Sequence, residues 1–117
     1  MNKKFSYKFG IFAEYFVVVY LTLLFYSIVS RRYKTKVGEV DIIARRGDSL
    51  VFVEVKARKS RAEVHSSLTV NQQGRIVRAA QLFLAKNPKY SQSNIRFDLI
   101  LLCPSFYLRH IKNAWYA

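Results

Sequence analysis

The chain has 117 residues, 51% of them hydrophobic and 15% aromatic, which excludes a disordered tail, a collagen-like repeat and a flexible linker, and predicts one domain over residues 1–117. Twenty Lys and Arg against seven Asp and Glu give a net charge of +13, which indicates a polyanionic partner: nucleic acid, an anionic membrane surface or an acidic protein. The single cysteine, Cys103, excludes an internal disulfide and indicates the reducing cytoplasm.

Residues 11–29 form an apolar run with one charged side chain, Glu14. Lysines precede the run and arginines follow it, as in a short membrane span. An acid is costly there, however, and the run barely reaches the length of about 20 residues that a span needs. We therefore predict a buried helix over residues 5–23, a buried strand over residues 24–32 and no membrane association. A membrane-attached basic protein is the alternative for this run.

Residues 37–59 contain two runs of alternating or β-branched side chains around a Gly-Asp pair, which predicts a β-hairpin. A two-residue turn of type II′, with Gly47 first, places Asp41 opposite Glu54. A turn shifted by one residue still leaves both acids on the same face, because side chains alternate across a strand. The two carboxyl groups are therefore expected to lie close together.

Two carboxylates opposite each other on paired strands repel, so Asp41 and Glu54 need a compensating group. A divalent cation such as Mg²⁺ suits hard oxygen ligands of this kind. Lys56 lies on the face of Glu54, and an acid pair with an adjacent ammonium suits phosphodiester hydrolysis: the metal activates water and polarises the phosphate, while the lysine orients the water or stabilises negative charge. The alternative is a solvated sheet face on which Glu39 forms an ordinary cross-strand pair with Lys56.

Apolar residues at three- and four-residue spacing predict a second helix over residues 70–86, which ends before a proline. Gln72 lies one turn before Ile76 on the inward stripe, from which its side chain can reach a site at the sheet. The alternative is a capping box, in which Gln72 folds back to the backbone amide of Thr69.

Residues 95–103 are almost continuously apolar, which predicts a central strand covered on both faces. Asp98 inside this strand needs a partner, and Arg96 on the same face is the nearest candidate, so we predict a structural ion pair. A last edge strand is expected over residues 107–111. Neither of the two histidines has a second histidine at ligand spacing, so no metal role is expected for them.

Several of these stretches match the motifs of a known family. Its core corresponds to GEVDII at residues 38–43, the hairpin turn and VFVEVKAR at residues 51–58; its opening Gly-x-x-x-Glu matches Gly10 and Glu14, and its Arg-Phe-Asp strand matches residues 96–98. Together they resemble the YraN-like family of small bacterial proteins, which is placed in the endonuclease-like PD-(D/E)XK superfamily. The likeness covers nearly the whole chain, and the full set of spaced elements is far more specific than a Glu-x-Lys triplet alone.

The resemblance implies an α/β fold, a restriction-endonuclease-like sandwich with a mixed β-sheet of four to five strands flanked by helices, as one endonuclease-like domain. It also implies one active site at which Glu14, Asp41, Glu54 and Lys56 meet. In that site Mg²⁺ or Mn²⁺ is held by Asp41, Glu54 and Glu14. The alternative for Glu14 is an acid satisfied by a neighbouring lysine or by the end of its helix.

The chain departs from the family pattern at three positions. Phe25 stands where a glycine usually ends the first helix, so this helix end is expected to form without a left-handed glycine. Arg31 and Arg32 replace an Arg-Asn pair at the end of the first strand. Gln72 replaces a lysine of the second helix, which removes one positive group from the implied site. We keep Gln72 among the expected catalytic residues, because related superfamily members use a glutamine near this position.

Six basic residues are expected to contact the phosphates of a nucleic acid, although solvated surface charge explains each one equally well. They are Arg45, Arg58, Lys59, Arg61, Arg75 and Arg78. The leading hypothesis is a nuclease-like protein that binds DNA and hydrolyses it as a Mg-dependent endonuclease, without a small-molecule cofactor. The alternative is a catalytically inactive DNA-binding module of a repair or recombination assembly, which the replacement at Gln72 favours.

Overall fold

The computed structural model describes residues 3–63 and 68–117, with side chains described from Tyr7 onward. The helices and strands in this part of the chain are α1 (Lys3–Leu23), β1 (Ser27–Lys34), β2 (Glu39–Arg46), β3 (Ser49–Ala57), α2 (Val70–Lys86), β4 (Asn94–Cys103) and β5 (Tyr107–Trp115). One of the two histidines, His65, lies outside the described residues.

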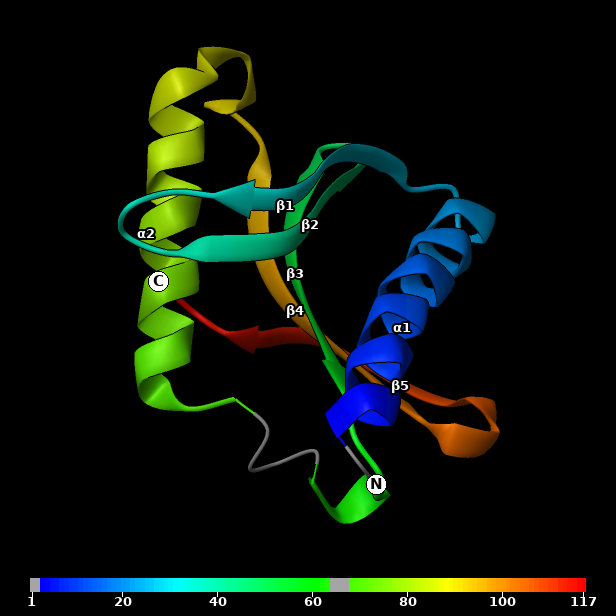
Figure 1. The fold of residues 1–117 in the computed structure, drawn as a ribbon. Coiled ribbons are helices and arrows are strands. Elements are labelled where there is room, and N and C mark those ends of the chain that lie inside the picture. The colour runs from blue at the N-terminus through cyan, green and yellow to red at the C-terminus, as the bar shows by residue number, and fades with distance from the viewer. Residues whose placement is uncertain (1–2, 64–67) are drawn as a thin grey trace.

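Among the described residues, five strands form one mixed sheet in the order β1-β2-β3-β4-β5. Strands β3 and β4 are parallel and joined through α2, as a parallel pair requires, whereas the other neighbours are antiparallel. Helix α1 covers one face of the sheet and α2 the other (Figure 1), and each helix packs into its own apolar cluster. The predicted fold class, α/β with a mixed sheet of four to five strands flanked by helices, is confirmed.

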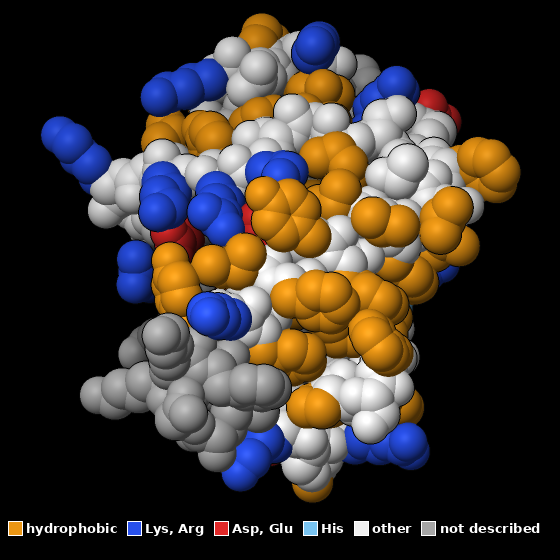
Figure 2. Space-filling view, turned by 45° about the vertical axis from the view of Figure 1, so that its right-hand side comes forward, with side chains coloured by type: hydrophobic (Ala, Val, Ile, Leu, Met, Phe, Trp, Pro, Cys, Tyr) orange, Lys and Arg blue, Asp and Glu red, His pale blue; other side chains and the backbone are white. Residues whose placement is uncertain are grey.

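Helix α1 is held to the sheet by a narrow buried stripe. Its members Ala13, Val17 and Leu21 recur every fourth residue and are 0% exposed, as the 3.6-residue period of a helix allows. The outer face of α1 is also apolar, and Figure 2 shows its hydrophobic side chains gathered there. Because both faces are apolar, the sequence of α1 lacks the amphipathic pattern of a surface helix. Within residues 3–63 and 68–117, no helix combines the length and the apolar character needed to pass through a bilayer.

The carboxyl end of α1 closes with two backbone hydrogen bonds that define a Schellman motif. The Tyr26 amide donates to the carbonyl of Leu21 at 3.0 Å, and the Phe25 amide donates to that of Thr22 at 3.0 Å. Phe25 itself adopts the left-handed conformation, with φ of 68°. This motif occupies the chain up to Tyr26, so β1 begins at Ser27 and not at the predicted residue 24.

Replacing Phe25 by glycine is expected to raise the free energy of unfolding by about 1 kcal/mol, because the left-handed backbone strains a residue that has a Cβ and does not strain glycine. The Phe25 side chain is 87% exposed, so little packing is lost. Urea denaturation measures the difference. Phe25→Ala is the control, since it removes the same ring but keeps the strain; an equal gain in both variants would assign the effect to the ring.

The β2–β3 hairpin and helix α2 have their predicted positions. Ile42 pairs with Val53, and Arg46 pairs with Ser49 across the turn, which is the predicted register. Gly47 opens the two-residue turn with φ of 58°, the positive value that the first position of a type II′ turn requires. Helix α2 begins and ends at the predicted residues.

Asp98 on β4 is 0% exposed and lies at the centre of a hydrogen-bonded network. Arg96 donates to both carboxylate oxygens, at 2.9 and 3.0 Å, which confirms the predicted ion pair. His110 Nε2 lies 2.6 Å from Asp98 Oδ2, and the Asn113 amide donates to Oδ1 at 3.1 Å. Burial alone would raise the pKa of Asp98, but the hydrogen bonds from His110 and Arg96 hold this pKa below its usual value. The carboxylate therefore stays ionised in the core.

The network also joins α1, and the residues that follow its carboxyl end, to strands β4 and β5. The Tyr20 hydroxyl of α1 lies 2.9 Å from Nδ1 of His110, and Arg96 donates to the Tyr26 hydroxyl. Sequence reasoning found neither tyrosine and did not pair His110. Strand β5 runs to Trp115, beyond the predicted residue 111.

Candidate active site

Strands β2 and β3 separate at the end of their paired segment, and a carboxylate fills the gap. The backbone register ends with Ile42 opposite Val53. At the residue before Ile42 on β2, Asp41 Oδ2 accepts a hydrogen bond from the Val55 amide at 2.8 Å. The Asp41 side chain thus replaces the next backbone bond of the ladder, which fixes its carboxylate between the two strands.

Glu54 lies beside this carboxylate, as the hairpin register predicts. Its pKa is raised to about 9 by burial, by a side-chain hydrogen bond with Asp41 and by the Asp41 charge, while Lys56 opposes the shift. The Lys56 ammonium Nζ lies 3.4 Å from Glu54 Oε2, and these side chains are only 12% and 15% exposed. At neutral pH Glu54 therefore keeps its proton, which relieves the repulsion expected from the sequence.

The raised pKa of Glu54 predicts that the free energy of unfolding falls as pH rises from about 4.5 to about 9. The unfolded chain releases this proton near 4.5, whereas the folded chain keeps it to about 9, so the folded state binds more protons in this window and loses stability through it. One proton gives a slope of at most about 1.4 kcal/mol per pH unit. In Glu54→Gln this contribution is absent.

Urea denaturation of wild type and Glu54→Gln at about pH 5 and about pH 8 checks this prediction, since the variant should gain stability relative to wild type as pH rises. Glu39→Gln is the matched control, because Glu39 lines the same pocket as Glu54. An equal pH-dependent change in the control would contradict the assignment to Glu54.

A pocket of about 170 Å³ lies between Glu54 and helix α2, with Lys56, Gln72 and Arg75 also in its wall. Gln72 forms both hydrogen bonds of the capping box. Its side-chain Oε1 accepts from the Thr69 backbone amide at 3.0 Å, and the Gln72 backbone amide donates to Thr69 Oγ1 at 3.2 Å. The capping interpretation of Gln72 is therefore confirmed. Gln72 also lines this pocket, so the structure brings it close to Glu54 as predicted. Its side-chain oxygen, however, already accepts the hydrogen bond from Thr69.

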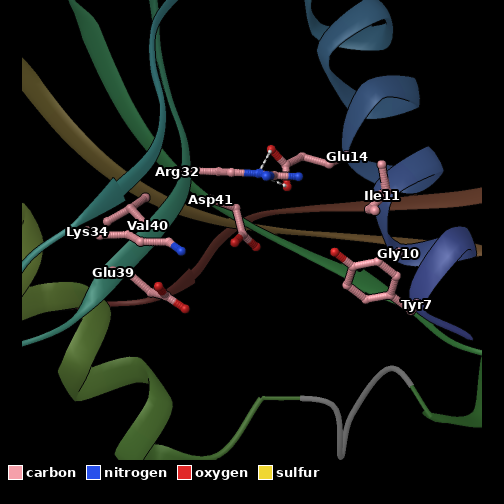
Figure 3. Close-up of a pocket in the computed structure, with 9 residues that line it drawn as sticks. All are labelled: Tyr7, Gly10, Ile11, Glu14, Arg32, Lys34, Glu39, Val40 and Asp41. Atoms are coloured by element: carbon pink, nitrogen blue, oxygen red, sulfur yellow. Dashed lines mark hydrogen bonds and ion pairs between the residues drawn. The ribbon is translucent and has the colours of Figure 1, made fainter. Parts of the chain in front are cut away.

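A larger pocket of about 410 Å³ opens between α1 and the strands β1 and β2, on the other side of Asp41. Figure 3 shows Asp41 pointing into it between Tyr7 of α1 and Lys34 of β1. Glu39 lines this pocket and the smaller one, so the two pockets adjoin. Sequence reasoning missed Tyr7 and Lys34, because their proximity to Asp41 depends on how α1 lies on the sheet.

Glu14 lines the larger pocket, but its carboxylate is held by two arginines of β1. Arg31 Nη2 lies 3.2 Å from Glu14 Oε1, and Arg32 Nε lies 3.1 Å from the same oxygen (Figure 3 shows the Arg32 pair). Its partners are therefore neither the lysine nor the helix end considered from the sequence. Arg32 has φ of 52°, a left-handed conformation in the middle of a strand that alters the direction of its side chain.

The three acids implied by the resemblance do not form one cluster. No group of three His, Cys, Asp or Glu side chains that could hold a metal occurs within the part of the chain that the structure describes. Asp41 and Glu54 are in direct contact, whereas Glu14 is engaged by its arginines. Two carboxylates are nevertheless a sufficient protein contribution for Mg²⁺, which is typically held by one or two carboxylates together with water and substrate phosphates.

The predicted phosphate contacts on helix α2 and strand β2 fall in different places. Arg75 lines the smaller pocket together with Glu54, and Arg78 is exposed further along α2. Arg45 lies at the opposite end of β2, about 13 Å from Asp41 along the strand, beside a separate pocket that includes Lys89. Strand β2 thus places Arg45 away from the acid pair, and its contact with a phosphate stays a prediction.

The remaining three predicted contacts follow the end of β3. Arg58 donates to a neighbouring backbone carbonyl at 2.9 Å and lies 3.9 Å from Glu63. The Arg61 guanidinium lies 4.0 Å from the centre of the Tyr107 ring, a distance at which a cation is attracted to an aromatic face. Lys59 is exposed. The two arginines of this segment therefore have protein partners, and its lysine extends into solvent.

In comparisons with known proteins, the matching family model and the similar proteins all carry the same family name. The model of UPF0102, an uncharacterised protein family, matches residues 13–102. A UPF0102 protein of Maricaulis maris is 40% identical over 106 residues, covering 91% of this chain and 84% of its own length. A UPF0102 protein of Nitrobacter winogradskyi is 42% identical over 108 residues, covering 92% of both chains, and one of Mesorhizobium japonicum is 38% identical over 112 residues, covering 96% of this chain and 90% of its own length.

Proposed function

We propose that this chain, which belongs to the uncharacterised, YraN-like protein family UPF0102, is a nuclease-like protein that binds DNA and hydrolyses its phosphodiester bonds with a divalent metal ion. One observation carries the proposal: two partly buried carboxyl groups, Asp41 and Glu54, are hydrogen-bonded to each other next to the Lys56 ammonium. Perturbed acids of this kind, facing a pocket on a strongly basic protein, are typical of catalytic sites.

The acid pair fits a hard divalent cation. Two carboxylates in contact cannot both ionise unless a positive charge lies beside them. Glu54 retains its proton for this reason, and a cation could take the place of that proton. Asp41 and Glu54 would hold Mg²⁺ or Mn²⁺ through their oxygens, and Glu54 would give up its proton. The bound ion would supply neutralisation of phosphate charge and a lower pKa for the attacking water.

Lys56 and the basic residues around the pockets have roles that follow from their positions. The Lys56 ammonium, 3.4 Å from Glu54, can donate hydrogen bonds to the attacking water or to a phosphate oxygen but cannot itself ligate a cation. Arg75 in the smaller pocket and Lys34 in the larger one place positive charge on either side of the acid pair. A phosphodiester chain lying across Asp41 would meet both.

A catalytically inactive DNA-binding module is the second candidate, and two contacts favour it. The Gln72 side chain is engaged in the cap of α2, and Glu14 is neutralised by Arg31 and Arg32. Both groups would have to exchange partners before they could serve a catalytic site.

Incubation of the purified protein with linear duplex, single-stranded and four-way DNA separates these candidates. The nuclease predicts cleavage with Mg²⁺ or Mn²⁺ and none with chelator, whereas the binding module predicts retention of DNA without cleavage under either condition. Binding measured over a salt series should weaken linearly with the logarithm of salt concentration, with a slope near 0.9 per phosphate contact on duplex DNA. Absence of binding at low salt would contradict both candidates.

A further inference from the structure

A third hollow lies on the α2 side of the β1–β2 turn and shares one lining residue with the larger pocket. It has a volume of about 560 Å³ and runs between the β1–β2 turn and helix α2. Lys34 lines both this hollow and the pocket that contains Asp41. We call it the turn groove; Tyr33, Lys34, Lys36, Val37, Leu82 and Lys86 form most of its wall.

The β1–β2 turn is held firmly in place over α2. Thr35 Oγ1 accepts hydrogen bonds from the amides of Val37 and Gly38, each at 3.1 Å, and donates to the Gly38 carbonyl at 2.7 Å. A Cβ at Gly38 would lie 2.0 Å from the backbone oxygen of Arg75, so this position requires glycine for the turn to touch the helix. The turn groove is therefore preformed, with little conformational entropy to lose on binding.

The wall of the turn groove combines unpaired positive charge with an apolar floor. Lys34, Lys36 and Lys86 form no ion pair with any acid in residues 3–63 and 68–117. Val37 is 45% exposed at the tip of the turn, and Leu82 contributes a second apolar side chain from α2. A partner that presents both anionic and flat apolar groups within a few ångströms fits this wall.

We propose that the turn groove binds an unpaired segment of nucleic acid leading to the acid pair, with phosphates on the three lysines and a base against Val37 and Leu82. The proposal rests on the proposed function for the identity of the polymer. Duplex DNA presents phosphates but keeps its bases stacked inside, so it would leave the apolar floor unused. A single strand exposes both parts, and binding sites for single strands combine basic grooves with side chains that contact the bases, mostly aromatic rings, of which Tyr33 is one in this wall.

The first test measures the affinity of metal-free protein, in chelator, for a fluorescent single-stranded oligonucleotide over a salt series. Lys36→Ala with Lys86→Ala is expected to weaken binding about tenfold and to reduce the salt slope by about 1.4, which corresponds to two phosphate contacts on a single strand. Arg109→Ala with Lys112→Ala is the matched control: it removes the same charge from exposed positions on β5, at the opposite edge of the sheet. Equal losses in the two double variants would overturn the proposal.

The second test asks whether bases are contacted at all. Wild type should bind the normal oligonucleotide about tenfold more tightly than an abasic one of equal length and charge, and Val37→Ser should reduce that ratio. Equal affinity for both oligonucleotides, or an equal loss of duplex binding in the Lys36 and Lys86 double variant, would overturn the proposal and leave the proposed function standing. A wild type that binds no nucleic acid would overturn both.

Discussion

Replacing Asp98 by alanine is expected to lower the free energy of unfolding by about 3 to 5 kcal/mol, the cost typical of removing one partner from a buried ion pair. Arg96 would lose both of its carboxylate contacts, and His110 would lose a contact of 2.6 Å. The Asn113 amide would also lose its acceptor. Urea denaturation monitored by tryptophan fluorescence measures this loss, because Trp115 lies in the core at the end of β5, the strand that carries His110 and Asn113.

Asp98→Asn provides a milder companion in case the alanine variant does not fold. It keeps the size of the side chain and one acceptor oxygen but removes the charge, so its loss of stability should be smaller than that of Asp98→Ala and still exceed about 1 kcal/mol. Asp48→Asn is the matched control, since Asp48 is an exposed acid in the hairpin turn and exposed charges contribute little to stability. Equal effects at the two positions would contradict a central role for Asp98.

Of the two side chains that contact Asp98, Arg96 could be predicted from the sequence and His110 could not. Arg96 lies two residues from Asp98 on one strand, so the alternation of side chains was enough to pair them. His110 reaches the same carboxylate across the β4–β5 pairing, whose register shifts between Phe97 and Leu99. An irregular register has no signal in the spacing of residues, so this partner could be found only from the structure.

At the candidate site, too, the local contacts were predicted from the sequence and the long-range ones were not. Asp41 and Glu54 were placed together by the length of one hairpin turn, a local constraint that the structure confirms. The raised pKa of Glu54 was not predicted, because it depends on burial under elements that are distant in the sequence. The arginine partners of Glu14 were missed because β1 has a register shift between Ile28 and Ser30 as well as the left-handed Arg32.

Two substitutions at the acid pair are expected to separate metal binding from hydrolysis. Lys56→Met should lower the rate of DNA cleavage by about 100- to 1,000-fold, the effect typical of removing one group that stabilises charge in the transition state. It should keep the stabilisation by Mn²⁺ or Mg²⁺, because an ammonium is not a metal ligand. Asp41→Asn should lose cleavage and this stabilisation together, since a ligand stabilises only a state that binds it. Cleavage assays and thermal melts with and without metal measure both quantities.

The fold itself should survive these changes, which makes the comparison informative. The amide oxygen of asparagine can still accept the hydrogen bond that the Val55 amide donates to Asp41 at 2.8 Å, so Asp41→Asn keeps the contact that joins the separated strands. Lys112→Met is the control for Lys56→Met, because Lys112 is exposed on the edge strand β5 and its loss should leave cleavage unchanged. If the wild type shows neither a metal-dependent melt nor cleavage, the three residues form only a charged sheet face, and the binding module becomes the better account of this protein.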